Sequence, residues 1–217
     1  MPHRSLTNKA VDSIINKLKS TKKYKRDGWL FQMISWIALK IDLHQQYGSG
    51  NVFMSATHSA PAQHGIDGFA LVTDDKKMMR YIVLCEDKCS EDARRIIVNQ
   101  VFGEFIKFEN GEYDSRVLTE VSSVIQGEGG DIILNNIQED ISNNKYWKYR
   151  IGITRQDEFD DENGRKELYR NYDDVIKGEI SRRSASSVNI KDMRNWMDTF
   201  CGLVINELEA NKTKDVQ

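Results

Sequence analysis

Two short segments of the chain carry acidic and basic side chains whose spacing suits metal-assisted chemistry. The first contributes Asp67, and the second is Glu86-Asp87-Lys88, which begins nineteen positions later. Because side chains on a strand alternate between faces, Glu86 and Lys88 share one face of a strand that ends there, and Asp87 points to the other. Polar groups at such a position must be solvated, paired or bound to a ligand, since burying them alone is costly.

A hairpin between two strands would bring these segments together. The turn expected at residues 74–76 divides the chain between Asp67 and Glu86 into arms of similar length, so antiparallel pairing sets the two carboxylates roughly opposite one another. Two carboxylates beside an ammonium group suit Mg²⁺ or Mn²⁺, and the backbone carbonyl of Asp87 is a further candidate ligand. Such an ion lowers the pKa of bound water, and Lys88 would position that water or neutralise developing negative charge.

Hydrophobic periodicity predicts the elements that must position these residues. They are a helix over 28–44, strands over 51–58, 66–72 and 81–88, a helix from Ser90, its expected N-cap, to Phe108, shorter helices over 116–126 and 131–143, a strand over 146–154, and helices over 165–177 and 190–211. The apolar run 81–85 is typical of a strand buried on both faces. Three consecutive strands argue against a uniform βαβ repeat and predict an α/β fold with a mixed sheet flanked by helices.

Length and composition favour one domain with its own core. The chain has 217 residues, of which 39% are hydrophobic and 29% charged, and it contains no apolar run long enough to span a bilayer. The first residues lack the apolar stretch of a signal peptide, and the chain has only three cysteines. These features predict a cytoplasmic protein with reduced thiols and no membrane partner.

Charge is distributed unevenly along the chain. Residues 1–26 contain eight basic side chains and one acidic residue, Asp12, which is a formal charge of +7, so the total of -2 leaves -9 for the rest. The total therefore excludes a uniformly basic DNA-coating protein. Two interpretations of the basic segment stay open, a solvated face of an amphipathic helix and a face that contacts nucleic-acid phosphates.

The arrangement of Asp67, Glu86 and Lys88 at strand ends resembles the PD-(D/E)xK, or restriction-endonuclease-like, nuclease superfamily. The resemblance implies a core of order α-β-β-β-α-β over 28–154, preceded by a basic helical extension over 1–27 and followed by C-terminal helices over 155–217, all in one domain. The chain departs from the family pattern at Ile66, where many members have proline. It implies a Mg²⁺- or Mn²⁺-dependent deoxyribonuclease of restriction, antiviral defence or repair.

The same resemblance assigns roles to individual residues. Asp67, Glu86 and Lys88 would be catalytic, with the metal held by the two carboxylates and the Asp87 carbonyl. Supporting roles would fall to Gln100 and Gln32. Apart from the resemblance, His64 lies close to Asp67 in the sequence and is a candidate contact for substrate phosphate or the attacking water. Basic residues near the N-terminus and in the helix after the motif either contact DNA or are solvated surface, namely Lys22, Lys23, Lys25, Arg26, Arg94 and Arg95. The side chain of Asp87 is expected to be solvated or to cap a helix. A helicase, a sensor or another subunit would supply targeting. The apolar stripe over 193–208 is expected to pack in the core or to form the seam of a homo-oligomer.

Other interpretations remain open at this stage. Lys88 would form only a structural salt bridge in a catalytically inactive binding or regulatory subunit that keeps the nuclease-like fold. A zinc site from His58, His64, Cys85 and Cys89 is disfavoured because the cysteine spacing is not typical of zinc motifs. An enzyme that uses a cysteine thiolate is disfavoured because no local signature accompanies Cys85 or Cys89.

Overall fold

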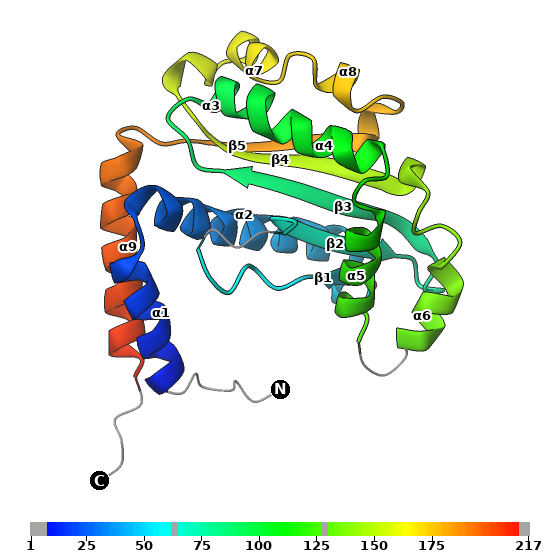
Figure 1. Ribbon diagram of the computed structural model, residues 1–217, viewed down its shortest axis with the longest axis horizontal. Helices are drawn as coiled ribbons and strands as arrows, with labels where there is room; N and C mark the ends of the chain where they lie inside the picture. The colour runs from blue at the N-terminus through cyan, green and yellow to red at the C-terminus, as the bar shows by residue number, and fades with distance from the viewer. Residues whose placement is uncertain (1–7, 62–64, 127–129, 213–217) are drawn as a thin grey trace.

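The computed structural model describes residues 8–61, 65–126 and 130–212, which form an α/β fold built on a five-stranded mixed sheet (Figure 1). The strands lie side by side in chain order: β1 (Val52–Met54), β2 (Gly68–Thr73), β3 (Met79–Lys88), β4 (Trp147–Arg155) and β5 (Arg183–Asn189). Strands β1, β2 and β3 pair antiparallel, whereas β3, β4 and β5 pair parallel. The α/β class and the mixed, helix-flanked sheet predicted from the sequence are confirmed.

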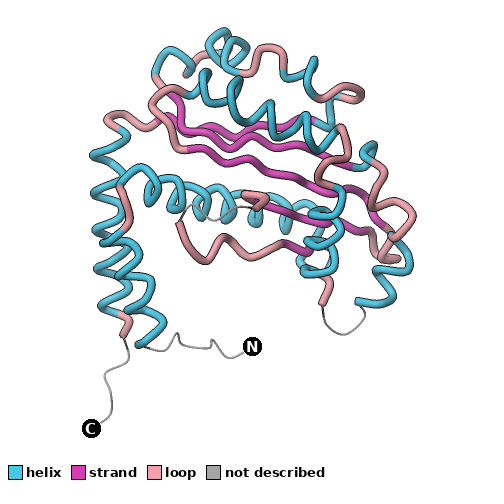
Figure 2. The backbone as a smooth tube through the Cα atoms, viewed as in Figure 1, coloured by secondary structure: helices cyan, strands magenta, loops and turns pink. Residues whose placement is uncertain are grey.

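Helices surround this sheet (Figure 2). The described residues form α1 (Asn8–Ser20), α2 (Lys23–Tyr47), α3 (Ala93–Ile96), α4 (Phe102–Glu109), α5 (Asp114–Val124), α6 (Gly130–Ile137), α7 (Glu162–Leu168), α8 (Tyr172–Val175) and α9 (Met193–Ala210). A π-helical turn, η2 (Ile97–Val101), joins α3 to α4. No helix in the described ranges is both long and apolar enough to cross a membrane.

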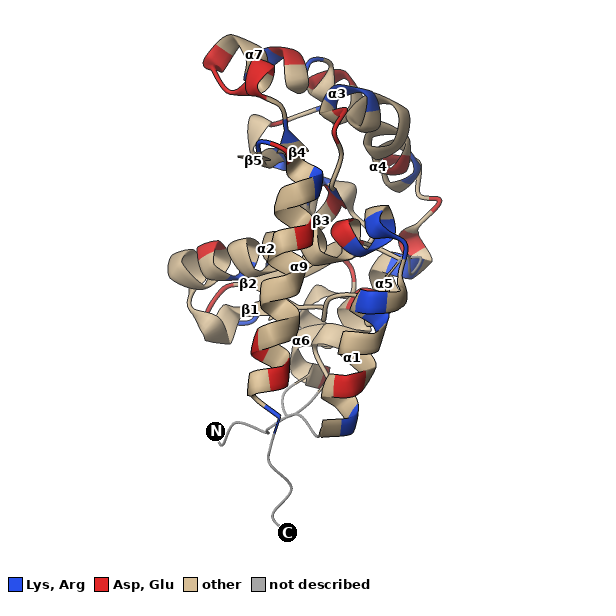
Figure 3. Cartoon of the chain, turned by 90° about the vertical axis from the view of Figure 1, so that its left-hand side faces the viewer, with Lys and Arg blue, Asp and Glu red and all other residues tan. Residues whose placement is uncertain are grey.

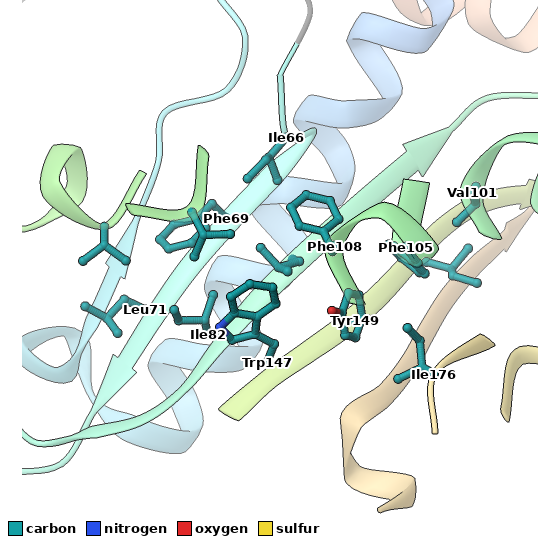
Figure 4. Close-up of a cluster of buried hydrophobic side chains, with 14 of the residues drawn as sticks. Ile66, Phe69, Leu71, Ile82, Val101, Phe105, Phe108, Trp147, Tyr149 and Ile176 are labelled. Atoms are coloured by element: carbon teal, nitrogen blue, oxygen red, sulfur yellow. The ribbon is translucent and has the colours of Figure 1, made fainter. Parts of the chain in front are cut away.

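Two hydrophobic clusters lie on opposite faces of the sheet. The larger packs α4, α5 and α8 against residues such as Phe69, Leu84 and Tyr149 (Figure 4), and the smaller packs α2 against Val83 and Cys85. Alternation along β3 thus sends Leu84 to one cluster and Cys85 to the other, as expected for a strand buried on both faces. Glu86 and Lys88 continue the series of Leu84, so they belong to the face covered by α4.

The helix that follows β3 contains apolar residues at every fourth position. Ala93, Ile97, Val101 and Phe105 are all fully buried. An α-helix turns once in about 3.6 residues, so a strict four-residue spacing would drift around its surface. The wider turn of η2 absorbs this drift and keeps all four side chains against the sheet.

The remaining differences from the predicted elements are local. Strand β1 is only three residues long, and α2 begins five residues earlier than predicted. Strand β5, which carries the run Arg-Ser-Ala-Ser-Ser-Val-Asn, lies in the region where only helices were predicted. Its small polar side chains give no apolar alternation because β5 is an edge strand whose residues are half-buried or exposed.

We predict that Gly152→Ala destabilises the fold. A Cβ atom at Gly152 on β4 would lie 1.9 Å from Asp87 Oδ1 and 2.7 Å from Ser35 Oγ, and both side chains are buried. Overpacking of this kind costs about 1–3 kcal/mol. Thermal or urea unfolding measures the loss. Gly202→Ala in α9 is the matched control, because nothing lies within 4 Å of its Cβ position; equal stability of the two variants would contradict the prediction.

Candidate active site

The predicted hairpin brings Asp67 and Glu86 together. Gly68 of β2 pairs with Cys85 of β3, so Asp67, one residue before Gly68, lies across from Glu86, one residue after Cys85. The prediction that antiparallel pairing sets these carboxylates opposite one another is confirmed. Lys88 ends β3 on the same face, two residues beyond Glu86.

One ammonium group joins the two carboxylates. Lys88 Nζ donates to Asp67 Oδ2 at 2.6 Å and to Glu86 Oε2 at 2.8 Å. Asp67 is held by two further donors: the backbone N–H of Asp87 at 3.0 Å from Oδ2, and Gln32 Nε2 at 2.6 Å from Oδ1. Gln32, predicted as a supporting residue, therefore orients the carboxylate of Asp67 directly.

The charges of this cluster do not balance. Asp67 and Glu86 are only 9% and 5% exposed, and two carboxylates share one ammonium. Burial raises the pKa of Glu86 to about 8; Lys88 opposes this shift and the charge of Asp67 adds to it. Burial by itself would lower the pKa of Lys88, but the two carboxylates outweigh it and raise that pKa, so the amine stays protonated.

The residues of this cluster have the chemistry needed to hold a hard divalent cation. Carboxylate oxygens are the preferred protein ligands of Mg²⁺, and Glu86 Oε1 accepts no hydrogen bond from any residue that the structure describes. A cation bound by Asp67 and Glu86 would offset the excess negative charge. Among the described residues, no group of three or more His, Cys, Asp or Glu side chains gathers as a metal site, so backbone oxygens or water would complete the coordination.

The cluster lies in a cleft between the sheet and the helices that follow β3. The volume of this cleft is about 500 Å³. One wall contains Asp67, Glu86 and Lys88. The other is formed by the π-helical turn, α4 and the start of α5, and contributes Asn99, Gln100, Gly103, Glu104, Lys107, Tyr113 and Arg116. A ligand in this cleft would lie within reach of Asp67, Glu86 and Lys88.

Gln100 lies on the opposite wall of this cleft. It belongs to η2, and π-helical turns inside α-helices occur frequently at functional sites. The start of this helix is fixed beside the end of β3, because the Asp92 side chain caps it at the N–H of Arg95 and Thr154 Oγ1 accepts from the N–H of Ser90. The N-cap is thus Asp92 rather than the predicted Ser90, whose hydroxyl instead accepts from the N–H of Asp92.

The side chain of Asp87 occupies the other face of the sheet, as alternation predicted. The expectation that it would be solvated or cap a helix is wrong: it is 3% exposed and accepts from Ser35 Oγ at 2.6 Å and Arg150 Nη1 at 3.4 Å. Burial raises the pKa of Asp87 to about 6, against the effect of Arg150 and Ser35. The buried pair fixes the backbone of Asp87, whose N–H holds Asp67.

The basic residues near the N-terminus divide into two kinds. Arg26 is buried and pairs with Asp27 at 2.6 Å and Asp198 at 2.5 Å, and Lys23 pairs with Asp198 as well. Lys22 and Lys25 are exposed and form no ion pair within the part of the chain that the structure describes. Helix α9, which contributes Asp198 to these ion pairs, lies beside α1 (Figure 3).

Arg94 and Arg95, which were predicted to contact DNA, are not among the residues that line the cleft. Arg94 donates to the backbone carbonyls of Leu168 and Arg170, which ties the α7 region to α3, and Arg95 pairs with Asp92 at 2.6 Å. His64 lies outside the described residues.

The two cysteines near the motif are poor nucleophiles. Burial raises the pKa of Cys85 to about 12 and that of Cys89 to about 12. A thiol with so high a pKa holds almost no thiolate at neutral pH. This chemistry tells against the interpretation that the protein is a thiol enzyme.

Several cleft residues were missed by the sequence analysis. Glu104 lies four positions after Gln100, a spacing that sets both on one side of a helix, so helical periodicity was a signal that could have identified it. Tyr113 and Arg116 gave no such signal, because the chain returns to the cleft only after the turn at Asn110-Gly111.

Comparison of the chain with protein-family models, curated proteins and solved structures finds no match.

We predict that Glu86 makes the metal-free protein less stable as the pH rises. A carboxyl group with a raised pKa binds its proton more tightly in the folded state, so its contribution is complete below its ordinary pKa of 4.5 and is lost as the pH approaches about 8. Urea unfolding in EDTA from pH 4.5 to 8.5 measures this slope. In Glu86→Gln the decline should be shallower, and identical slopes in both proteins would contradict the prediction.

Proposed function

We propose that this protein is a metal-dependent nuclease that hydrolyses phosphodiester bonds of DNA, in restriction, antiviral defence or repair. The observation that carries the proposal is the position of Lys88 Nζ, within hydrogen-bond distance of both Asp67 and Glu86 in an open cleft. A structural ion pair needs one carboxylate for one ammonium. The charge of the second buried carboxylate is compensated only if a cation also binds to the cluster.

The strand order supports a restriction-endonuclease-like core. Antiparallel β1, β2 and β3 are followed by the helical segment α3–α4 and then by β4, parallel to β3. This is the order that the resemblance to the PD-(D/E)xK superfamily implies. The proposal therefore rests on the strand order and on the geometry of the site.

Each residue of the cluster has a distinct part in the proposed reaction. Asp67 and Glu86 would hold Mg²⁺ or Mn²⁺, and the bound ion supplies Lewis acidity at a phosphoryl oxygen and acidifies water. Lys88 remains protonated, so it orients the attacking water and offsets negative charge that develops on the phosphate. Gln32 keeps Asp67 in place through its 2.6 Å hydrogen bond.

We expect cleavage of plasmid or single-stranded DNA in Mg²⁺ or Mn²⁺ and none in EDTA. Asp67→Ala, Glu86→Ala and Lys88→Ala should each lower the rate on the order of 10²–10³-fold, because each removes charge stabilisation from the reacting phosphate. Lys166→Ala is the matched control, since Lys166 is an exposed lysine paired with Glu162 on α7 and lies away from the cleft.

The alternative, a catalytically inactive binding or regulatory subunit, predicts a different outcome. The wild-type protein would then cleave neither plasmid nor single-stranded DNA, whichever metal ion is present. Thermal unfolding with and without Mg²⁺ or Mn²⁺ separates the cases further, because a ligand that binds only the folded state raises Tm. A metal-dependent rise that Glu86→Ala abolishes supports the nuclease. No rise and no cleavage would favour the binding subunit.

The basic segment contains exposed, unpaired lysines and a buried, paired arginine, and this difference leads to a separate prediction for the described residues. Replacement of both Lys22 and Lys25 by Ala should weaken DNA binding and flatten its dependence on salt, by a slope of up to about 1.8 if each lysine contacts one phosphate of duplex DNA. Arg26→Ala should instead destabilise the fold, since it breaks the ion pairs with Asp27 and Asp198. Fluorescence anisotropy at several salt concentrations and urea unfolding measure the two effects. An unchanged salt slope in the double variant would leave both lysines as solvated surface.

A further inference from the structure

The wall of the cleft that faces the catalytic cluster carries its own group of charged and aromatic side chains. Glu104 and Lys107 come from α4, Tyr113 directly precedes α5, and Arg116 lies in the first turn of α5. The proposed reaction gives none of these four residues a part in holding the metal or the attacking water. Their arrangement therefore calls for a separate explanation.

Contacts within this group fix the aromatic ring in place. Tyr113 Oη donates to Glu104 Oε2 at 2.9 Å, and Lys107 Nζ donates to Glu104 Oε1 at 2.8 Å. The Tyr113 ring also packs against the buried Phe108 ring in an edge-to-face arrangement, with 5.0 Å between the ring centroids. One carboxylate and one core side chain thus hold Tyr113 at the edge of the cleft.

Two cations lie against this ring. The guanidinium carbon of Arg116 is 4.2 Å from the centroid of the Tyr113 ring, and Lys107 Nζ is 5.7 Å from it. A cation near an aromatic face is attracted by the ring, so the contact restricts Arg116 without neutralising its charge. A guanidinium that is restricted in advance loses less entropy when it binds a phosphate.

Charge also differs between the two walls. With Glu86 ionised, Asp67, Glu86 and Lys88 carry one excess negative charge, whereas Glu104, Lys107 and Arg116 carry one excess positive charge. Arg116 is exposed and forms no ion pair with any carboxylate in the described ranges of the chain, while Lys107 already pairs with Glu104. The free charge on this wall is therefore that of Arg116.

We infer that Arg116, supported by Tyr113 and assisted by Lys107, binds a phosphate of the DNA strand next to the one that is cleaved. This inference builds on the proposed nuclease function and makes the substrate a polynucleotide strand rather than an isolated phosphodiester. The planar guanidinium suits the two oxygens of a phosphate. Both walls line one cleft of about 500 Å³, so neighbouring phosphates of a single strand can contact them together.

The test measures the cleavage of two substrates by the 217-residue chain in the presence of Mn²⁺. One is a single-stranded DNA oligonucleotide, and the other is bis(p-nitrophenyl) phosphate, a diester with no neighbouring phosphate. Arg116→Ala should raise KM for the oligonucleotide on the order of tenfold and leave the rate with the small diester unchanged. Arg80→Ala is the matched control, because Arg80 is also an exposed arginine over a tyrosine, 5.8 Å from the ring centroid of Tyr47, and lies outside the cleft.

A binding measurement keeps this inference distinct from the nuclease proposal. Anisotropy of a labelled single-stranded oligonucleotide in EDTA should show a salt slope smaller by about 0.7 for Arg116→Ala than for wild type, as expected when one phosphate contact is lost. If the wild type cleaves neither substrate, the nuclease proposal fails, and this binding result alone decides the role of Arg116. Equal KM values for the oligonucleotide, or equal salt slopes in wild type and Arg116→Ala, would overturn the inference.

Discussion

The site depends on one ammonium group shared by two buried carboxylates. Lys88 reaches both Asp67 and Glu86, and burial, to which the charge of Asp67 adds, raises the pKa of Glu86 to about 8. Such a cluster persists in a folded protein only where surrounding elements restrict it, because buried charge without a full complement of partners is costly. The antiparallel pairing of β2 with β3 provides that restriction, and Gln32 and the backbone of Asp87 complete it.

The two faces of β3 carry different kinds of polar cluster. On one face, Glu86 and Lys88 open into a cleft that a ligand can enter. On the other face, Asp87 forms a closed group with Ser35 and Arg150, tied to α2 and β4. Asp87 anchors the strand through the closed group, whereas Glu86 and Lys88, on either side of Asp87, belong to the open cluster. The side chains that line the cleft and those that are closed in the core are thus separated by the pleat of a single strand.

Local patterns of the sequence were sufficient for the part of the site that lies on neighbouring strands. The alternation of Glu86, Asp87 and Lys88 and the two arms of the hairpin follow from strand geometry alone. Contacts between distant segments were not accessible in this way. Nothing near Arg26 indicates that Asp198 would neutralise it, and nothing near Asp87 indicates Arg150. Strand β5 was missed because an edge strand with small polar residues has no apolar period to detect.

The π-helical turn between α3 and α4 has a consequence for how this protein can tolerate changes in length. Residues on both sides of η2 pack against the sheet in one register, from Ala93 to Phe105. Deletion of a single residue within Ile97–Val101 would restore a regular α-helix, in which the four buried residues would be spaced by four, three and four positions and would still share one face. The core would tolerate this deletion, whereas the segment that carries Asn99 and Gln100 would lose the wider turn that sets it on the wall of the cleft. A change of length in this turn would therefore act on the cleft rather than on the core.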